Sequence, residues 1–334
     1  MIKKGYFAIV FACFCTFYAC NSNKFDVDIT NIKVDLTINR LDLDLMANYP
    51  DTPDVKLLQN KYDKFFELYT KLIIEIGEPG EPNFTNYLME FNNYCKEYNI
   101  PSKVETEFGD LNNLKSSINN AFRYYKYYFP NKIIPAIYTF LSGFRMSVVT
   151  DEGILGIGLD KYLGANCDLY AAQGIDNYKA RRMEASMIPS DCMRAIAISE
   201  FPYIDSVNNL LNQIVYEGKV QYFLDAMLPF ENDTIKFGYT KDQFEWAQYN
   251  ESKMWAHLIE NQILFSTDEL IIRKMIGDSP FTALFANNSA PRAGAFLGWK
   301  IVHKYMETHP EIDLNKLMLN KDYQGILNAA GYKP

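Results

Sequence analysis

Two glutamates stand on the apolar faces of two consecutive predicted helices, and their placement restricts how the chain can fold. Apolar residues recur every three or four positions over residues 189–201 and again over residues 205–228, which predicts one helix in each stretch. Glu200 and Glu217 occupy positions in these apolar series. A buried carboxylate is costly unless it is paired, hydrogen-bonded or bound to a metal. Each glutamate therefore needs a partner, and the candidates nearby in sequence are Arg194, Lys219 and Tyr222.

Three kinds of arrangement satisfy this requirement. The simplest is a buried ion pair or a hydrogen bond from a tyrosine hydroxyl to each carboxylate. A zinc peptidase would use one glutamate as general base and another as metal ligand. A glycosidase would need only two carboxylates at a suitable separation. The residues themselves leave these alternatives open.

The N-terminus predicts a lipoprotein signal peptide over residues 1–19. Two lysines precede an apolar run over residues 6–19, which ends in the small residue Ala19 and is followed by Cys20. The run is shorter than the about 20 residues that span a bilayer, so it favours a lipoprotein over a transmembrane anchor. Cys20 is therefore the predicted site of lipid attachment, although the two residues before Ala19 are bulkier than such signals usually carry.

The rest of the chain is predicted to be a short tether, residues 20–25, and one domain, residues 26–334. The chain carries 33 basic and 41 acidic residues, a net charge of −8, which becomes −10 without the two signal-peptide lysines. Such an acidic protein is not expected to bind nucleic acid or anionic lipid by charge. Its membrane contact is expected through the lipid on Cys20. The remaining cysteines have no CxxC spacing and are predicted to be buried free thiols: Cys95, Cys167 and Cys192.

Hydrophobic patterning predicts an α+β fold that is mostly helical, with a small antiparallel sheet or hairpin. Apolar and polar residues alternate over residues 26–38, which predicts an N-terminal strand, and a turn signal at residues 150–153 predicts a hairpin over residues 145–160. Pro202 should end or kink the first glutamate-bearing helix, and Asp205 or Ser206 should cap the second. The other predicted helices cover residues 55–76, 84–98, 110–129, 240–266 and 291–310, with short ones at 314–319 and 322–334.

Familiar catalytic motifs are missing or incomplete. No G-x-S-x-G nucleophile elbow occurs, and "GILGIG" at residues 153–158 lacks the glycine order of a nucleotide-binding loop. His257 is interpreted as a polar core or groove residue rather than a ligand. Arg292 follows a proline at a predicted helix start, where the helix dipole disfavours a cation, so it should have a carboxylate partner. Glu200 or Glu217 is the expected partner.

Several longer blocks carry a resemblance to a known family. They are "IPSDCMRAIAISEFP", "IVYEGKVQYFLDAMLP", "FGYTKDQFEWAQYNE", "WAHLIENQILFSTD" and "PRAGAFLGWKIVHKYM". With these blocks the sequence resembles the gliding-motility lipoprotein GldB family over nearly the whole chain. That family in turn resembles helical zinc peptidases of the H-E-x-x-H class, with a third glutamate in an "EG" helix and a later P-R-x-G-x-x-x-G helix.

The resemblance implies a peptidase scaffold that has lost its chemistry. Glu200 matches the general base and Glu217 the third zinc ligand, while Ser199 and Tyr203 stand where the two histidines should be. Neither residue type is a plausible zinc ligand at neutral pH. The expectation is a non-catalytic protein without metal or cofactor, with Arg292, His257 and Tyr222 as possible supporting residues. A hydrolase that uses Glu200 and Glu217 is the alternative.

The resemblance also implies where the protein acts. A lipid-anchored protein of the bacterial cell envelope that contributes to gliding motility, or to the linked secretion machinery, is expected to bind other proteins of that machinery. The tether after Cys20 lacks an acidic run, which favours the periplasmic side.

Overall fold

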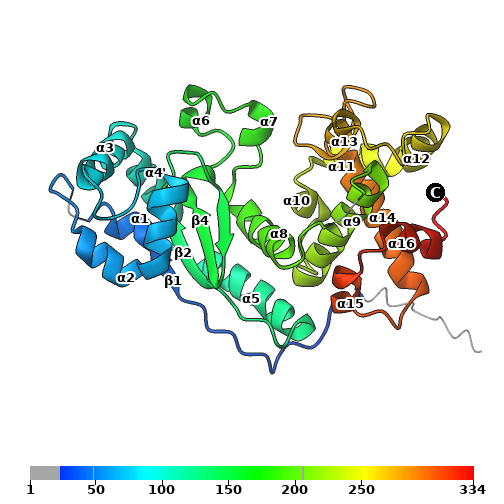
Figure 1. Ribbon diagram of the computed structural model, residues 1–334, viewed down its shortest axis with the longest axis horizontal. Coiled ribbons are helices and arrows are strands. Elements are labelled where there is room, and N and C mark those ends of the chain that lie inside the picture. Colours follow the sequence, from blue (N-terminus) through cyan, green and yellow to red (C-terminus); the bar gives the residue numbers. More distant parts are fainter. Residues whose placement is uncertain (1–22, 48, 205–206) are drawn as a thin grey trace, which may run out of the picture.

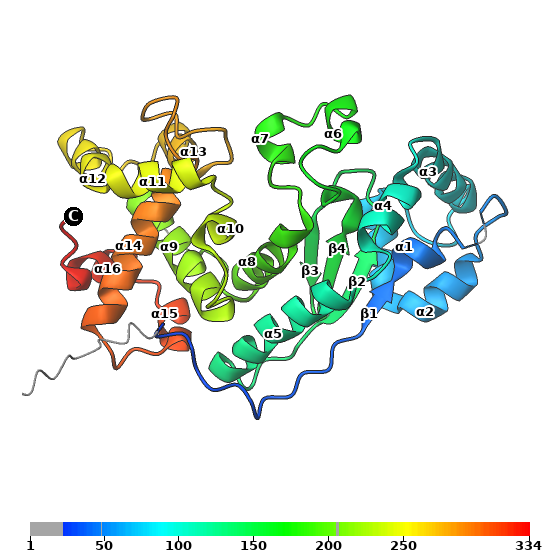
Figure 2. The ribbon, with the colours of Figure 1, turned by 180° about the vertical axis from the view of Figure 1, so that it is seen from behind.

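The computed structural model describes residues 23–47, 49–204 and 207–334, and these residues fold into helices around one small sheet. Figure 1 and Figure 2 show the sheet and its helices at one end of the molecule and a helical C-terminal half at the other. The α+β, mostly helical class predicted from the sequence is confirmed. The signal peptide, Cys20 and the predicted caps Asp205 and Ser206 lie outside the described residues.

The sheet is mixed, whereas the sequence predicted an antiparallel one. Its strands are β1 (Ile38–Arg40), β2 (Ala136–Phe140), β3 (Val148–Asp151) and β4 (Ile154–Gly158), in the order β1-β2-β4-β3. The hairpin β3–β4 is antiparallel as predicted, but β1 pairs with β2, and β2 with β4, in parallel. The parallel pairing of β1 with β2 arises because several helices connect these strands, and such a crossover lets the chain re-enter in the same direction.

The alternation at the N-terminus corresponds to an extended segment rather than to a long strand. Only Ile38–Arg40 pairs with the sheet, and residues 26–37, here called the strap, run from the C-terminal half along α5 (Asn112–Tyr128) to the sheet (Figure 1). Arg123 on α5 donates to the carbonyl oxygens of Ile29 at 2.6 Å and Ile32 at 2.9 Å. The alternating apolar side chains are therefore used for packing against a helix, not for strand pairing.

Helices cover both faces of the sheet. One face packs against α1 (Leu41–Asp44), α2 (Val55–Leu68), the π-helical turn Tyr69–Ile73 and α3 (Phe84–Glu97), through residues such as Phe65 and Phe140. The other face packs against α4 (Ile100–Phe108) and α5, through residues such as Phe122 and Ile137. The predicted helices at 55–76, 84–98 and 110–129 are confirmed in place. Helix α4 was not predicted.

The loop between β2 and β3 is organised by one buried carboxylate. Asp160 accepts hydrogen bonds from the backbone N–H groups of Ser142 and Phe144, the latter at 2.7 Å, and from the Ser142 hydroxyl. The side chain is fully buried. Burial outweighs these hydrogen bonds and raises the pKa of Asp160 to about 6. The loop that takes the chain from β2 past β4 to β3 is thus held by a carboxyl group that titrates in a mildly acidic range.

The C-terminal half is almost entirely helical. Its longer helices are α8 (Ile188–Glu200), α9 (Leu210–Met227), α11 (Lys241–Tyr249), α12 (Glu251–Glu260), α13 (Glu269–Ile276) and α14 (Ala293–Thr308). The shorter ones are α6 (Asp168–Ala172), α7 (Asn177–Ala180), α10 (Asp233–Phe237), α15 (Leu314–Leu319) and α16 (Tyr323–Ala330), with 3₁₀ turns at Leu159–Lys161 and Ala185–Met187. No helix among the described residues is both long and apolar enough to cross a bilayer.

The predicted long helix over residues 240–266 is two helices. Thr240 caps α11 in a capping box with Gln243, but the chain leaves helical geometry at Asn250 (φ −103°, ψ 10°). The Asn250 side chain donates to the carbonyl oxygen of Trp246 at 2.8 Å. An asparagine side chain can satisfy a helix-end carbonyl in this way, which stabilises a break that the apolar spacing does not signal.

Helices α9 and α14 cross at contact distance and form the centre of the C-terminal half. A Cβ atom built on Gly298 would lie 1.8 Å from the carbonyl oxygen of Ile214, and one on Gly218 would lie 2.1 Å from the carbonyl carbon of Gly298. Only glycines allow the two backbones to approach so closely. Helix α9 is buried on nearly all sides, so the single apolar stripe assumed for it was too narrow.

Candidate functional site

Glu217 is held by two arginines. Its Oε2 accepts hydrogen bonds from Nη2 of Arg194 on α8 at 2.7 Å and from Nη2 of Arg292, just before α14, at 2.8 Å. The Glu217 side chain is 12% exposed. Burial raises the pKa of this carboxyl, but the two guanidinium groups outweigh burial and hold the pKa below its usual value. The predicted carboxylate partner of Arg292 is therefore confirmed as Glu217.

The backbone of Arg292 adopts a left-handed conformation (φ 48°, ψ 43°). A non-glycine residue is uncommon there and the conformation is strained. The Glu217 carboxylate explains why arginine, rather than glycine, occupies this helix start. The ion pair with Glu217 also compensates the unfavourable interaction between the Arg292 cation and the positive end of the helix dipole.

Further charges surround this ion pair and form what we call the arginine–carboxylate cluster: Arg182, Arg194 and Arg292 with Asp191, Glu217 and Asp278. Arg182 Nη1 donates to Asp278 Oδ1 at 3.3 Å, and the Tyr162 hydroxyl donates to Asp191 Oδ2 at 2.9 Å. Burial raises the pKa of Asp191, opposed by the nearby arginines. Arg182 and Asp278 are partly open to solvent, whereas Arg194, Arg292 and Glu217 are largely buried. Pairing offsets the cost of burying the charges of these three side chains.

Glu200 has a different environment. It ends α8, its side chain is 31% exposed, and it forms an ion pair with Lys132. Glu200, Ser199 and Lys132 line a cavity of about 620 Å³, here called the Glu200 cavity, with Tyr125 and the β3–β4 turn. The Lys132 ammonium also lies 5.5 Å from the ring centroid of Phe201. The two glutamates thus pair with different cations, and no contact between described residues joins them in one site.

The positions that would carry zinc-binding histidines do not share a helical face. Helix α8 ends at Glu200, and Phe201 leaves helical geometry (φ −131°, ψ 63°) before Pro202. Ser199 is exposed on the last turn, whereas Tyr203 packs against the rings of Tyr216 and Tyr323 at 5.3 and 5.6 Å. The prediction that Pro202 ends the helix is confirmed, and the spacing of a two-histidine motif is not preserved.

The other candidates have partners elsewhere. His257 on α12 contacts Asn261, at 3.3 Å between Nδ1 and the amide nitrogen, and the ring of Phe285. Lys219 donates to the carbonyl oxygens of Met318 and Asn320 at the end of α15. Within residues 23–47, 49–204 and 207–334, no three histidine, cysteine or acidic side chains are grouped so that they could hold a metal ion.

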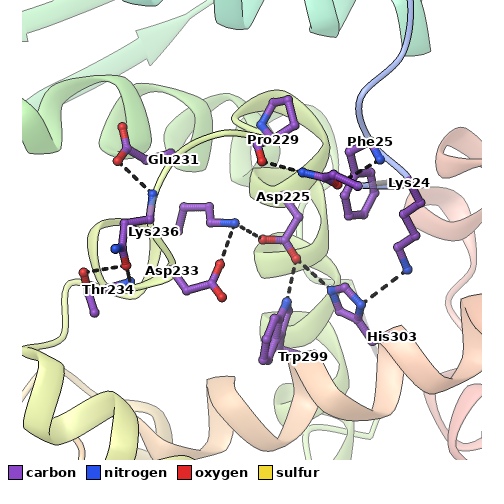
Figure 3. A network of polar contacts seen from close by, with 12 residues as sticks. Lys24, Phe25, Asp225, Pro229, Glu231, Asp233, Thr234, Lys236, Trp299 and His303 are labelled. Carbon is purple, nitrogen blue, oxygen red and sulfur yellow. Dashed lines mark hydrogen bonds and ion pairs between the residues drawn. The ribbon is translucent and has the colours of Figure 1, made fainter. Parts of the chain in front are cut away.

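The C-terminal half holds a second polar network that the sequence did not predict (Figure 3). At its centre the Asp225 carboxylate accepts hydrogen bonds from Lys236, from Trp299 Nε1 at 2.6 Å and from His303 Nε2 at 2.8 Å. Asp225 is only 3% exposed. Burial raises its pKa, but His303 and Lys236 outweigh burial and lower it. Tyr222 itself packs on the His303 ring, with 4.8 Å between ring centroids.

The first described residues dock onto this network. The Asn23 side chain donates to the carbonyl oxygen of Pro229 at 2.6 Å, and Lys24 Nζ lies 3.3 Å from His303 Nδ1. An ammonium can only donate, so Nδ1 must offer a lone pair and Nε2 must carry the hydrogen given to Asp225. Phe25 is buried against Tyr222. The spacing of Trp299 and His303, four residues apart on one helix, was the available sequence signal.

The comparisons with known proteins give one match. A family model described as gliding motility protein GldB matches residues 22–334. No curated protein and no solved structure matches. The family resemblance stated from the sequence is confirmed, whereas the likeness to zinc peptidases stays a prediction.

Proposed function

Because the chain belongs to the gliding-motility protein GldB family, we propose that it is a non-catalytic, lipid-anchored component of the bacterial cell envelope. In this role it contributes to gliding motility, or to the secretion machinery linked to it, by binding other envelope proteins. The observation that carries the proposal is the extent of the family match, which spans residues 22–334 and so includes both halves of the fold.

The surroundings of the two glutamates support a non-catalytic role. Glu217, the residue that a peptidase would use as zinc ligand, is already bound by Arg194 and Arg292. Two guanidinium groups on one carboxylate oxygen oppose the approach of a metal cation. At the histidine positions stand Ser199 and Tyr203, on a chain that leaves the helix between them. Each feature removes one requirement of the H-E-x-x-H mechanism.

The lipid anchor is proposed on Cys20, with the folded domain on the periplasmic side. Replacement of Cys20 by Ala should move the protein from the membrane fraction to the soluble fraction of the cell envelope and reduce gliding in a host that depends on it. Metabolic labelling with palmitate would report the anchor directly. Unchanged membrane attachment of the Cys20→Ala protein would contradict the proposal.

The non-catalytic role is tested separately. The purified protein should contain no stoichiometric zinc, and a strain that carries Glu200→Gln should glide as well as the parent strain. Stoichiometric zinc in the purified protein would overturn the proposal, as would loss of gliding by a Glu200→Gln protein that is made, anchored and folded normally.

A hydrolase centred on Glu200 is the second candidate. The Glu200 cavity favours it, because Glu200, Ser199 and Lys132 line one space of about 620 Å³ next to the acidic β3–β4 turn. This candidate predicts hydrolysis of a peptide or glycan substrate that is abolished by Glu200→Gln. A Glu217→Gln protein that is still folded in the assay should keep this activity, because Glu217 is held in the arginine–carboxylate cluster and does not line this cavity.

A further inference from the structure

The end of the chain that leads to the proposed anchor is fixed on the folded domain. Asn23, Lys24 and Phe25, here called the latch, contact the end of α9, the loop after it and α14. Phe25 is 7% exposed, and its ring lies 5.1 Å from that of Tyr222 and 6.2 Å from that of His303. The Lys24 ammonium lies 4.8 Å from the centroid of the Tyr222 ring. The latch therefore defines where on the surface the chain departs toward Cys20.

Chain length limits how far the bilayer can be from this point. Cys20 precedes Asn23 by three residues, which span at most about 10 Å when fully extended. A diacylglyceryl group on Cys20 has its acyl chains in the bilayer. The surface around Asn23 must then lie next to the lipid headgroups.

An exposed aromatic residue lies beside this point. The Asn23 amide bonds the carbonyl of Pro229, and the next residue, Phe230, is 70% exposed in the loop between α9 and α10. One exposed phenylalanine is ordinary on a protein surface. Its position, adjacent to the departure point of an anchored chain, makes it the apolar group best placed to enter the membrane interface.

We propose that the latch orients the domain so that the α9–α10 loop rests on the lipid surface with Phe230 in the interface. This inference rests on the proposed anchor at Cys20. Attraction between opposite charges does not supply the orientation, because the processed chain is acidic. The orientation comes from the short connection and from the contacts of Asn23, Lys24 and Phe25.

The test measures which part of the surface contacts lipid. The full chain is produced in an acylating bacterial host and reconstituted into vesicles of phosphatidylethanolamine and phosphatidylglycerol that contain brominated phospholipid. A fluorophore is attached at Phe230→Cys in a Cys167→Ser background, since Cys95 and Cys192 are fully buried. Bromine quenches a fluorophore only when it lies in or at the bilayer.

Phe265 provides the matched control position. It is also an exposed phenylalanine, at 54%. The backbone N–H groups of Leu210 and Leu211 donate to the carbonyl oxygens on either side of Phe265, which places Phe265 at the start of α9. Phe230 instead follows the end of that helix. The 18 residues of α9 separate the two ends by about 27 Å. The label at position 230 should be strongly quenched and the label at Phe265→Cys should not.

A latch variant completes the test. Phe25→Ala should abolish the difference in quenching between the two positions, while flotation with vesicles and the acyl group are retained. Lys24→Ala, which keeps the buried ring, serves as the second variant if Phe25→Ala unfolds. Equal quenching at both positions in an acylated protein that floats with vesicles would overturn the proposed orientation and leave the proposed anchor at Cys20 standing. A protein without an acyl group that stays off the vesicles would overturn the anchor, and this inference with it.

Discussion

Oε2 of Glu217 accepts hydrogen bonds from two arginines that approach from α8 and from the start of α14. This single atom joins three helices, since Glu217 itself lies on α9. The interaction is strong in context because both cations and the carboxylate are largely removed from water. Glu200 offers a contrast, since its ion pair with Lys132 is partly open to solvent.

Glu217→Gln should destabilise the protein by roughly 3–5 kcal/mol, because it leaves two buried guanidinium groups without their charged partner. Glu200→Gln is the matched control and should cost less than about 1 kcal/mol, because exposed ion pairs contribute little. Urea unfolding of both variants measures the two free energies. Similar costs for the two substitutions would show that Glu217 is not the buried charge described above.

The sequence predicted that both glutamates need partners. Of the partners that lie far away along the chain, it identified only one. Arg292 was identified because a cation at a helix start is unfavourable without a carboxylate. Lys132 could not be identified, because nothing in its local sequence connects it to Glu200, which lies 68 residues further along the chain. The Asp225 network was missed for the same reason, since Trp299 and His303 reach Asp225 only through the crossing of α9 and α14.

Among the elements, the crossing of α9 and α14 depends on small residues. Gly218 and Gly298 let the backbones touch. At Gly294 an added Cβ would meet Ile276 of α13 at 2.7 Å and Ile214 of α9 at 3.3 Å. The G-x-x-x-G spacing of Gly294 and Gly298 was visible in the sequence as part of a family block. The spacing did not show which helix packs there, because small residues allow a close approach but do not identify the partner helix.

Gly298→Ala should destabilise the protein by about 3 kcal/mol or more, because the added methyl group would overlap the Ile214 carbonyl and the helices would have to separate. Lys304→Ala, on an exposed position of the same helix, should change the unfolding free energy by less than about 0.5 kcal/mol. Thermal unfolding of both variants tests this. A Gly298→Ala protein as stable as the parent would mean that the close crossing is not required.

Asp160 gives the loop between β2 and β3 a dependence on pH. Its pKa is about 6 in the folded protein and 3.8 as the reference value, so its contribution to stability is fully present below about pH 4 and lost as the pH rises through about 6. Asp160→Asn lacks this titration. Relative to the parent protein, the variant should therefore become more stable as the pH rises from about 4 to about 7. Urea unfolding at both pH values measures the difference, and a constant difference would contradict the raised pKa.

Across the whole molecule, the strap connects the two ends of the fold. It begins at the latch on α9 and α14, passes along α5 and ends in β1 (Figure 2). The alternation in its sequence predicted a strand, and the local pattern could not distinguish an edge of a sheet from a segment that packs on a helix. The class of the fold was predictable because it depends on the number and type of elements. The path of the strap was not, because it depends on contacts with Arg123, about 90 residues away.

Arg123→Ala should loosen the strap, because the carbonyl groups of Ile29 and Ile32 lose their hydrogen-bond donor. Trypsin should then cut more rapidly after Lys33, an exposed residue of the strap. Lys115→Ala, on an exposed position of the same helix, serves as control. Mass spectrometry of the early fragments measures the rate of cutting at this bond, and equal rates in the two variants would contradict the role of Arg123.

The strap and the latch also determine how the molecule would respond to a pulling force. Tension applied through the N-terminus reaches the contacts of Asn23 and Lys24 first, then Phe25, then the two carbonyl groups held by Arg123, and β1 last. These contacts are loaded one after another rather than together, so they would break in sequence. If the chain is anchored at Cys20 as proposed, release of the latch and the strap would lengthen the connection between anchor and domain, while the helices and the paired strands β2, β3 and β4 stay folded.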